Sequence, residues 1–473
     1  MRKPYTIAIV GGGLSGSLTA YHLLQRIQDA RVLVIEPKAD LGLGLAYSTP
    51  SHRHLLNVPA GKISAVPSQP RHFLDWLRAN YDPSFQAEDF APRAIFGKYI
   101  QSLIASVAHR MEHVKSSVVG CHGNGEQAAL SLESGISLNA DAVVLAMGNF
   151  NPAPLPGVSE EVVHSGTYCH SAWESATYEG LSADAPVALI GTGLTAVDVT
   201  LRLREHGHRG VITAISRHGI FPNRHAAYEP LPQCVITGKA PRKAHLLLCA
   251  VHRAIREGKP WRAVIDSLRS RTNELWQALP LEEQRRFRRH LQRRWDVVRH
   301  RMAPSIADRI ECELAEGTLV KRSGNLQAVS LLQGSTCIQW QTLDGEIAEM
   351  KVARVINCTG PDMNYRRVGS ALLNNLFAQG LAVPGPLGGG LWSDEHGALR
   401  AQDGSFSSIL FQVGPGRQGT LLESIAVLEL REQAYALADQ LSEKASEVSE
   451  ARALRAKLSL IQEQNAVTAA HSA

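Results

Sequence analysis

The sequence predicts an α/β fold with two parallel-sheet domains and a helical insertion. The order strand, glycine-rich turn, helix occurs twice, first from Thr6 and again from Ala185. After the second unit comes an Arg-rich stretch in which apolar residues such as Leu247, Val251 and Ile255 recur at helical spacing. Strands that alternate with helices are typical of parallel sheets covered by helices. At 473 residues the chain is long enough for two or three domains.

The first glycine-rich turn has the pattern of a Rossmann-like dinucleotide-binding site. An apolar strand at 6–10 precedes it, and these residues form the turn and open the helix: Gly11, Gly13, Leu14, Ser15 and Gly16. The first glycine permits the tight turn, the second lets a pyrophosphate approach the backbone, and the third lets the helix pack on the strand. The helix N-terminus supplies free N–H groups to phosphates. The next strand ends at Glu36, where an acidic side chain binds ribose hydroxyls.

The second turn repeats this spacing with alanine in place of the third glycine, which the motif permits. Its residues are Gly191, Gly193, Leu194, Thr195 and Ala196. The strand that follows ends at Ser216 and Arg217, with no acidic residue. A carboxylate there would repel a 2′-phosphate, whereas Arg217 can pair with it, so the site is predicted to prefer NADPH to NADH. The alternative for Arg217 is a surface salt bridge.

Two further strands end in glycine, at Gly148 and at Gly360. With these signatures the sequence resembles, from residue 7 to about 434, the flavoproteins with two dinucleotide-binding domains. It is similar in particular to the FAD/NAD(P)-binding family related to class B flavin monooxygenases and amino-acid N-hydroxylases. The resemblance implies an FAD domain into which an NADPH domain is inserted. It also implies that residues 44–61, which include Asn57, face the flavin, and that the segment from Gly414 leads into a helix whose N-terminus faces the flavin's pyrimidine edge.

The reaction expected from this resemblance is monooxygenation. Gly166, His170 and Trp173 resemble the class B fingerprint, although His164 replaces a phenylalanine and the tryptophan comes one residue early. NADPH would reduce the flavin, O₂ would form a peroxyflavin, and a small substrate such as an amine or amino acid would be oxygenated. Asn57 is the candidate flavin-edge hydrogen-bonding residue, and Arg301 the candidate partner of an acidic substrate or of NADPH. A turn cap and a surface ion pair are the alternatives for these two residues.

Two other functions fit the same motifs. An NADPH-dependent flavin reductase or dehydrogenase would use both cofactors without oxygen insertion. A flavin-bound sensor or assembly protein would dock a partner through its basic helices. Residues 241–310 carry 17 Arg and Lys against 7 Asp and Glu. We interpret this excess as a solvated helical face rather than a nucleic-acid surface, or as arginines that attract a phosphorylated nucleotide.

The remaining expectations concern metals, membranes and domain limits. The seven cysteines include no C-x-x-C pair, which argues against a zinc site or dithiol centre, so no metal is expected. No apolar run is long enough for a membrane span, so a cytoplasmic location is expected, and an oligomer is left open. The predicted domains are an FAD-binding part at 1–160, an NAD(P)H-binding domain at 161–240, an Arg-rich helical insertion at 241–315, a second FAD-binding part at 316–440 and a helical tail at 441–473.

Overall fold

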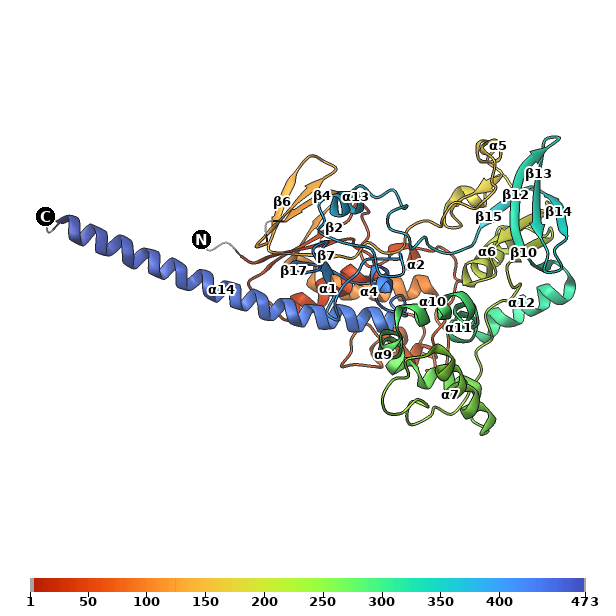
Figure 1. Cartoon of the computed structure of the whole chain (residues 1–473), viewed down its shortest axis with the longest axis horizontal. Coiled ribbons are helices and arrows are strands. Elements are labelled where there is room, and N and C mark those ends of the chain that lie inside the picture. Colours follow the sequence, from red (N-terminus) through yellow and green to blue (C-terminus); the bar gives the residue numbers. More distant parts are fainter. Residues whose placement is uncertain (1–3, 124, 472–473) are drawn as a thin grey trace.

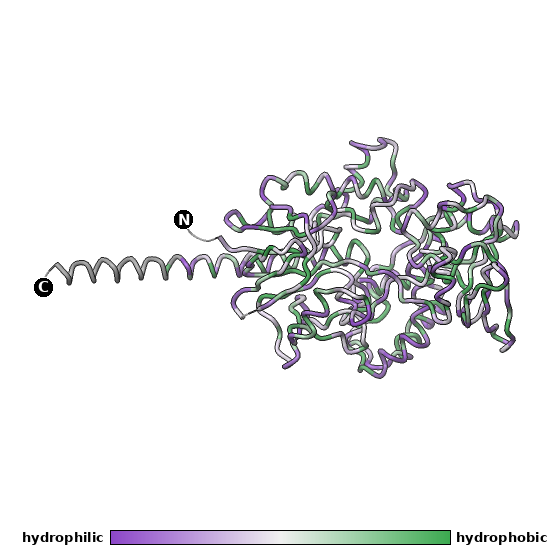
Figure 2. The backbone as a smooth tube through the Cα atoms, turned by 90° about the horizontal axis from the view of Figure 1, so that it is seen from above, coloured by the Kyte–Doolittle hydropathy of each residue, from purple (hydrophilic) through white to green (hydrophobic). Residues whose placement is uncertain are grey.

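The computed structural model describes residues 4–123 and 125–471, so the ends of the predicted terminal segments (1–3 and 472–473) lie outside the described residues. It confirms the α/β fold: two sheet-based bodies lie side by side, and a group of helices lies below the junction between them (Figure 1). Coloured by hydropathy, the backbone is hydrophobic along much of the interior and hydrophilic along many outer loops (Figure 2).

The first body is built on a six-stranded sheet in the order β16-β17-β7-β1-β2-β3. Its strands are β1 (Thr6–Val10), β2 (Arg31–Ile35), β3 (Met111–Val114), β7 (Ala142–Leu145), β16 (Ala398–Arg400) and β17 (Phe406–Gln412). All neighbours are parallel except β16, which runs antiparallel to β17. Strand β1 is buried along its whole length, as expected of an apolar strand in the middle of a covered sheet.

Helices and a small antiparallel sheet complete the first body. The helices are α1 (Leu14–Leu24), α2 (Gly44–Tyr47), α3 (His72–Asn80), α4 (Arg93–Val107), α13 (Ala371–Ala378) and α14 (Val427–His471). The small sheet consists of β4 (Val118–Gly123), β5 (Ala128–Leu132) and β6 (Ser137–Ala140). Helix α14 packs along α1 and then runs out from the body as one continuous helix (Figure 1).

The second body is built on a five-stranded parallel sheet in the order β11-β10-β9-β15-β8. Its strands are β8 (Tyr168–Cys169), β9 (Val187–Ile190), β10 (Ile212–Ser216), β11 (Leu319–Ser323) and β15 (Arg354–Asn357). Its helices are α5 (Glu160–His164), α6 (Leu194–Glu205) and α12 (Pro304–Glu316), and an antiparallel sheet is added by β12 (Asn325–Leu332), β13 (Ser335–Gln341) and β14 (Ile347–Val352).

The predicted return to the first body at residue 316 is wrong. Strand β11 pairs in parallel with β10, and β15 lies between β9 and β8, so residues up to about 357 still belong to the second sheet. Helix α12, placed in the insertion by the sequence, packs Ala307 and Ile310 into the core of the second body. A strand's sequence shows that it is buried but not which sheet it joins, which explains the error.

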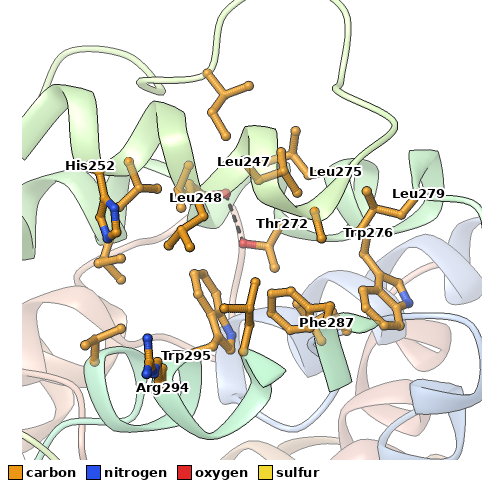
Figure 3. A pocket seen from close by; sticks show the side chains of 18 of the residues that line it. Leu247, Leu248, His252, Thr272, Leu275, Trp276, Leu279, Phe287, Arg294 and Trp295 are labelled. Atoms are coloured by element: carbon orange, nitrogen blue, oxygen red, sulfur yellow. Dashed lines mark hydrogen bonds between the residues drawn. The ribbon is translucent and has the colours of Figure 1, made fainter. Parts of the chain in front are cut away.

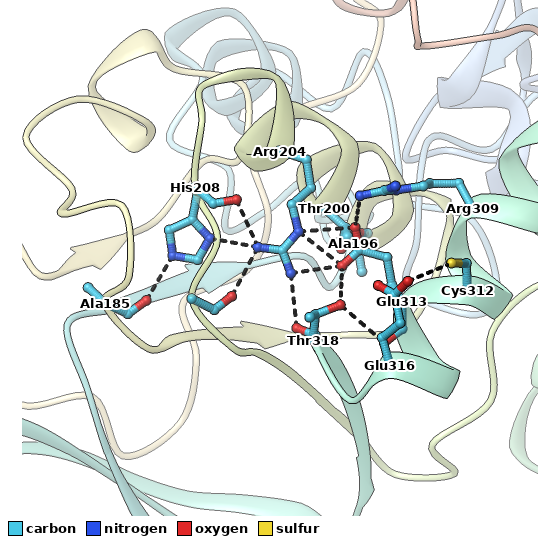
Figure 4. A network of polar contacts seen from close by, with 11 residues as sticks. Ala185, Ala196, Thr200, Arg204, His208, Arg309, Cys312, Glu313, Glu316 and Thr318 are labelled. Carbon is cyan, nitrogen blue, oxygen red and sulfur yellow. Dashed lines mark hydrogen bonds and ion pairs between the residues drawn. The ribbon is translucent and has the colours of Figure 1, made fainter.

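A buried ion pair joins α6 to α12 in the second body (Figure 4). Nε and Nη2 of Arg204 donate to Oε2 of Glu313 at 2.9 and 2.8 Å, and the glutamate side chain is 1% exposed. The same carboxylate accepts from Thr318 Oγ1 at 2.7 Å and Arg309 Nη2 at 2.6 Å. These donors hold the pKa of Glu313 below its usual value, although burial alone would raise it.

The helical insertion consists of five short helices: α7 (Ala244–Arg256), α8 (Trp261–Ser267), α9 (Thr272–Ala278), α10 (Leu281–His290) and α11 (Gln292–Arg299). Pro260 and Pro280 immediately precede α8 and α10, as the proline punctuation predicts. Several arginines of α10, including Arg285, Arg286 and Arg289, are exposed, which agrees with a solvated face. Within the described part of the chain, no helix combines the length and apolar character of a membrane span.

Candidate functional site

The first glycine-rich turn places free backbone donors beside an acidic side chain. Gly13 is the N-cap residue of α1 and provides no side-chain cap, which leaves first-turn N–H groups available to an anion. Glu36 lies next to the turn, because its Oε2 accepts from the N–H of Gly12 at 2.9 Å. A Cβ on Gly13 would lie 3.4 Å from Cα of Gly44, so a larger side chain would fill the space over the turn. These features fit a dinucleotide pyrophosphate with its ribose at Glu36.

Two glycines make the backbone of this turn possible. Gly11 has a φ of +105°, and a Cβ there would lie 2.3 Å from the carbonyl oxygen of Ala146. A Cβ on Gly16 would lie 1.9 Å from the carbonyl oxygen of Gly11. Gly414 lies against the same turn from the C-terminal part of the chain, since a Cβ on it would lie 2.7 Å from Ser15 Oγ. The structure therefore gathers Gly11, Gly16, Ser15 and Gly414 around one turn.

The second turn has the same construction. Gly191 has a φ of +124°, and a Cβ on it would lie 2.4 Å from the carbonyl oxygen of Cys358, which precedes Gly360 by two residues. Gly193 is the N-cap of α6, again with no side-chain cap, and Ala196 is fully buried behind it. In both bodies the first glycine thus packs on the end of a neighbouring strand, and each of those strands leads into a glycine at positive φ, Gly148 or Gly360.

A cavity of about 470 Å³ lies over the second turn and holds the predicted phosphate-binding residue. Arg217, Gly191 and Gly360 are among its lining residues. A second arginine, not identified from the sequence, is Arg293 of α11: its Nη2 donates to the carbonyl oxygen and Oγ1 of Thr192 at 3.0 and 3.1 Å. Burial lowers the pKa of Arg293. The basic insertion therefore supplies one cation directly to this cavity.

A central cavity of about 500 Å³ is lined by all three parts of the molecule. The first body contributes Asn57, the start of α14 and the α4 residue Arg93. The second body contributes Leu194 and Thr195 from its glycine turn, and the insertion contributes α11. Gly193, Thr195, Arg293, Asp296 and Gly360 line both this cavity and the one over the second turn, so the two adjoin.

The two bodies are fixed to each other at the edge of this cavity. Arg93 Nη1 lies 2.7 Å from Oδ2 of Asp198 on α6, and both side chains are largely buried. His54 Nε2 bonds the backbone carbonyl of Asp198 at 3.0 Å, and its ring meets Trp173 edge-on at 6.4 Å. Trp173 of the class B-like stretch lines the central cavity, whereas His170 instead bonds Tyr168 Oη at 3.3 Å.

A cluster of buried charges joins the insertion to the start of α14. Arg299 donates from Nε and Nη2 to the two carboxylate oxygens of Glu423 at 2.9 and 2.8 Å. Arg269 forms a similar double contact with Glu429 at 3.0 Å. Burial raises the pKa of Glu423, and burial together with the charge of Arg299 lowers the pKa of His300 to about 4. His300 is therefore a neutral imidazole at pH 7.

Arg301 is not part of this site, which corrects the prediction that it meets substrate or NADPH. Its side chain is almost fully buried and its Nη2 pairs with Asp266 of α8, while the Tyr228 and Trp261 rings lie 5.9 Å from its guanidinium carbon. It is absent from the linings of both cavities. The backbone leaves the helical region at His300 (ψ of 76°), so residues 299 and 301 reach different partners. No group of three or more His, Cys, Asp or Glu residues among the described ones is arranged as a metal site.

Comparisons with known proteins agree with the motifs. Residues 8–150 match the FAD-NAD(P)-binding family. The uncharacterized protein YdhS of Escherichia coli K12 is 25% identical over 267 residues, which is 48% of each chain. The FAD-binding monooxygenase ausC of Emericella nidulans is 23% identical over 225 residues, covering 44% of this chain and 32% of that protein. The chain thus spans half or less of the length of these curated relatives.

The fold is matched along almost the whole chain. The ornithine N-hydroxylase of Kutzneria sp. 744 superposes with a TM-score of 0.66 at 14% identity, over 93% of this chain and 100% of that one. At this identity the match establishes the architecture only. Residues 8–150 therefore match an FAD-NAD(P)-binding family, and the chain as a whole has a fold similar to that of the Kutzneria ornithine N-hydroxylase.

Proposed function

We propose that this protein is an NADPH-dependent FAD monooxygenase that oxygenates a small molecule. The observation that carries the proposal is the central cavity, which adjoins the NADPH-type cavity and is lined by the first body, the second body and the insertion together. A site that must bring two cofactors and a substrate together needs this arrangement. The match of residues 8–150 to an FAD-NAD(P)-binding family supports the first cofactor, and the relative ausC supports the reaction class.

The residues of the two turns suit different dinucleotides. Glu36 beside the first turn suits the free ribose hydroxyls of FAD. At the second turn the corresponding strand end carries Ser216, whose Oγ bonds Thr192 Oγ1 at 2.8 Å, and the cavity there contains Arg217 and Arg293. Two guanidinium groups without a carboxylate at the strand end favour a nucleotide with an added 2′-phosphate. We therefore assign FAD to the first turn and NADPH to the second.

In the proposed reaction, the bound cofactors supply hydride transfer and oxygen activation. The chain positions them and shields the site. Residues 425–428, which lead into the start of α14, line the central cavity, so the N-terminal N–H groups of this helix offer partial positive charge where an anion is to be stabilised. Trp295 and Leu422 present apolar surface to the same cavity, which reduces access of water. Asn57 remains our candidate hydrogen-bonding residue at the flavin edge, because it lines this cavity.

The test is rapid-scan absorbance of the FAD-loaded protein, reduced anaerobically by NADPH and then mixed with oxygen. We expect an intermediate absorbance band that persists before the oxidised flavin spectrum returns. Rapid reduction followed by reoxidation with no intermediate would contradict oxygenation and indicate a reductase. Failure to retain added FAD would reject the proposal altogether.

Asn57→Ala tests the role of that side chain separately. We expect this variant to keep its FAD and to consume NADPH while releasing more hydrogen peroxide per NADPH than the wild type. Peroxide yield with unchanged FAD content is the measurement. An unchanged yield would reject Asn57 as a flavin-edge residue without touching the cofactor assignments.

A further inference from the structure

The helical insertion forms a third cavity, away from the glycine turns, of about 310 Å³. Side chains from α7, α9, α10 and α11 point into it (Figure 3). Most are aliphatic or aromatic, for example Leu247, Leu248, Leu275, Trp276 and Phe287. The single hydroxyl in its lining, that of Thr272, already donates to the carbonyl oxygen of Leu268 at 3.0 Å. An apolar lining of this kind favours apolar ligands.

Helix α7 covers this cavity and packs against its walls through Ala244, Leu247 and Val251, but it buries few of its side chains completely. Of its 13 residues only Ala244 and Ala254 are buried. Leu247, Leu248 and Val251, which line the cavity, are only partly buried, so part of their apolar surface remains exposed. Protein interiors normally leave few voids larger than a water molecule. The apolar side chains of α7 that border this space could contact a bound apolar molecule.

The position of the cavity indicates which kind of ligand it binds. Trp295 and Leu422 line both this cavity and the central cavity. Nε1 of Trp295 is buried and has no hydrogen-bond partner among the described residues. One molecule could therefore fill the apolar cavity and extend a polar end to the place where the cofactors meet.

The charge around the cavity limits the ligand further. Arg294 and His252 are exposed members of its lining, and the insertion as a whole has a strong excess of basic residues. Positive potential of this kind attracts anionic molecules and disfavours cationic ones. The ligand class is thus neutral or anionic at the end that meets these residues.

We propose that the insertion cavity binds the apolar body of the substrate, an amphipathic, neutral or anionic small molecule whose reacting end enters the central cavity beside Trp295. The substrate role rests on the proposed monooxygenase function. The binding role does not, because it requires only the cavity.

Binding is tested on the oxidised, FAD-loaded protein with 1-anilinonaphthalene sulfonate as a fluorescent probe. Straight-chain alcohols from butanol to dodecanol are then used to displace it. We expect affinity to rise about fourfold with each added methylene until the cavity is filled, which is the increment expected for a buried methylene group. Affinity that does not depend on chain length would overturn the proposal.

Two neighbouring leucines of α7 provide a matched pair of variants. Leu248 lines the cavity, whereas Leu246 is 45% exposed and does not line it. Leu248→Trp fills the space and is expected to weaken dodecanol binding at least tenfold, while Leu246→Trp leaves it unchanged. Both variants should retain FAD. If Leu248→Trp does not fold, as judged by circular dichroism, Val251→Phe takes its place. Equal losses in both variants would overturn the proposal.

The substrate role has its own readout. A long-chain alcohol held beside the cofactors is expected to change the rate of NADPH oxidation in the wild type but not in Leu248→Trp. An unchanged rate in the wild type would overturn the substrate role. If NADPH does not reduce the flavin at all, the proposed function fails, and the displacement series still decides whether the cavity binds alkyl chains. Self-association that Leu248→Trp abolishes, without alcohol binding, would assign the cavity to a protein contact and overturn the proposal.

Discussion

Breaking the ion pair between Arg299 and Glu423 is expected to destabilise the junction between the insertion and the central cavity. The pair is bidentate, at 2.9 and 2.8 Å, and its side chains are only 7% and 5% exposed. Loss of one member of a buried pair typically destabilises a protein by about 3–5 kcal/mol. Nη2 of Arg299 also lies 3.6 Å from Glu429, which shares the guanidinium charge. We therefore expect Glu423→Met to lower the free energy of unfolding by about 3 kcal/mol, the lower end of that range.

The assay is urea denaturation followed by circular dichroism, arranged as a double-mutant cycle with Arg299→Met. The double variant should be less destabilised than the sum of the single variants, because it leaves no buried charge without its partner. The exposed pair of Arg209 and Asp184, at 70% and 71% exposure, is the control, and Arg209→Met should change stability little. The reasoning is refuted if Glu423→Met costs no more than this control, or if the single effects simply add.

Three further predictions concern Arg217, the buried residue His22 and the pair of Glu313 and Arg204. Arg217→Gln is expected to raise the KM for NADPH about 10- to 100-fold in steady-state assays, because one charge-assisted hydrogen bond is lost. The KM for NADH should stay nearly unchanged. Equal effects on both coenzymes would contradict a contact between Arg217 and the 2′-phosphate. Burial lowers the pKa of His22 to about 4. Between pH 6.5 and 4 the unfolded chain therefore binds a proton at this residue that the folded protein does not bind. The contribution of His22 to the free energy of unfolding is fully present above pH 6.5 and should fall by up to about 3 kcal/mol as the pH drops to 4. His22→Leu should reduce the slope of stability against pH in urea titrations, with the contribution of His300 remaining, and the exposed His52→Gln should not; identical slopes would disprove the assignment. Glu313→Gln leaves the buried guanidinium of Arg204 without its counter-charge and should destabilise by about 3–5 kcal/mol in thermal denaturation, whereas an unchanged melting temperature would show that the other acceptors of Arg204 suffice.

The predictable parts of the fold are those that short stretches of sequence determine. Gly11 and Gly191 each stand directly after an apolar strand and before a helix, and the structure places both at positive φ against a neighbouring strand end. The assignment of residues 316–357 to the first body was wrong, because the partner of a strand is not specified by its local sequence. Leu319 pairs with Ile212, more than 100 residues earlier, and nothing local in either strand specifies that partner.

The site was predicted unevenly for the same physical reason. Asn57, Arg217 and Gly360 were identified because each belongs to a recognisable segment, and all three line the cavities. Arg293 was missed because it is one arginine among many in a basic segment. Its place in the cavity depends on a hydrogen bond to Thr192, which lies 101 residues away in the sequence. Arg301 was misplaced because the sequence does not show that α11 ends at Arg299 and that the following residues turn toward Asp266.

The first sheet joins β7 to β17, with Leu410 beside Val143, and this pairing has a consequence for how the chain folds during synthesis. The ribosome must deliver the whole second body and the insertion before β17 emerges to complete the first sheet. Residues 168–357 contain all the strands of the second sheet, so that sheet can close first. The half-built first sheet meanwhile exposes β7 as an open edge, which is prone to wrong pairing in a nascent chain. We expect limited proteolysis of stalled nascent chains to show protection of the second body before the first.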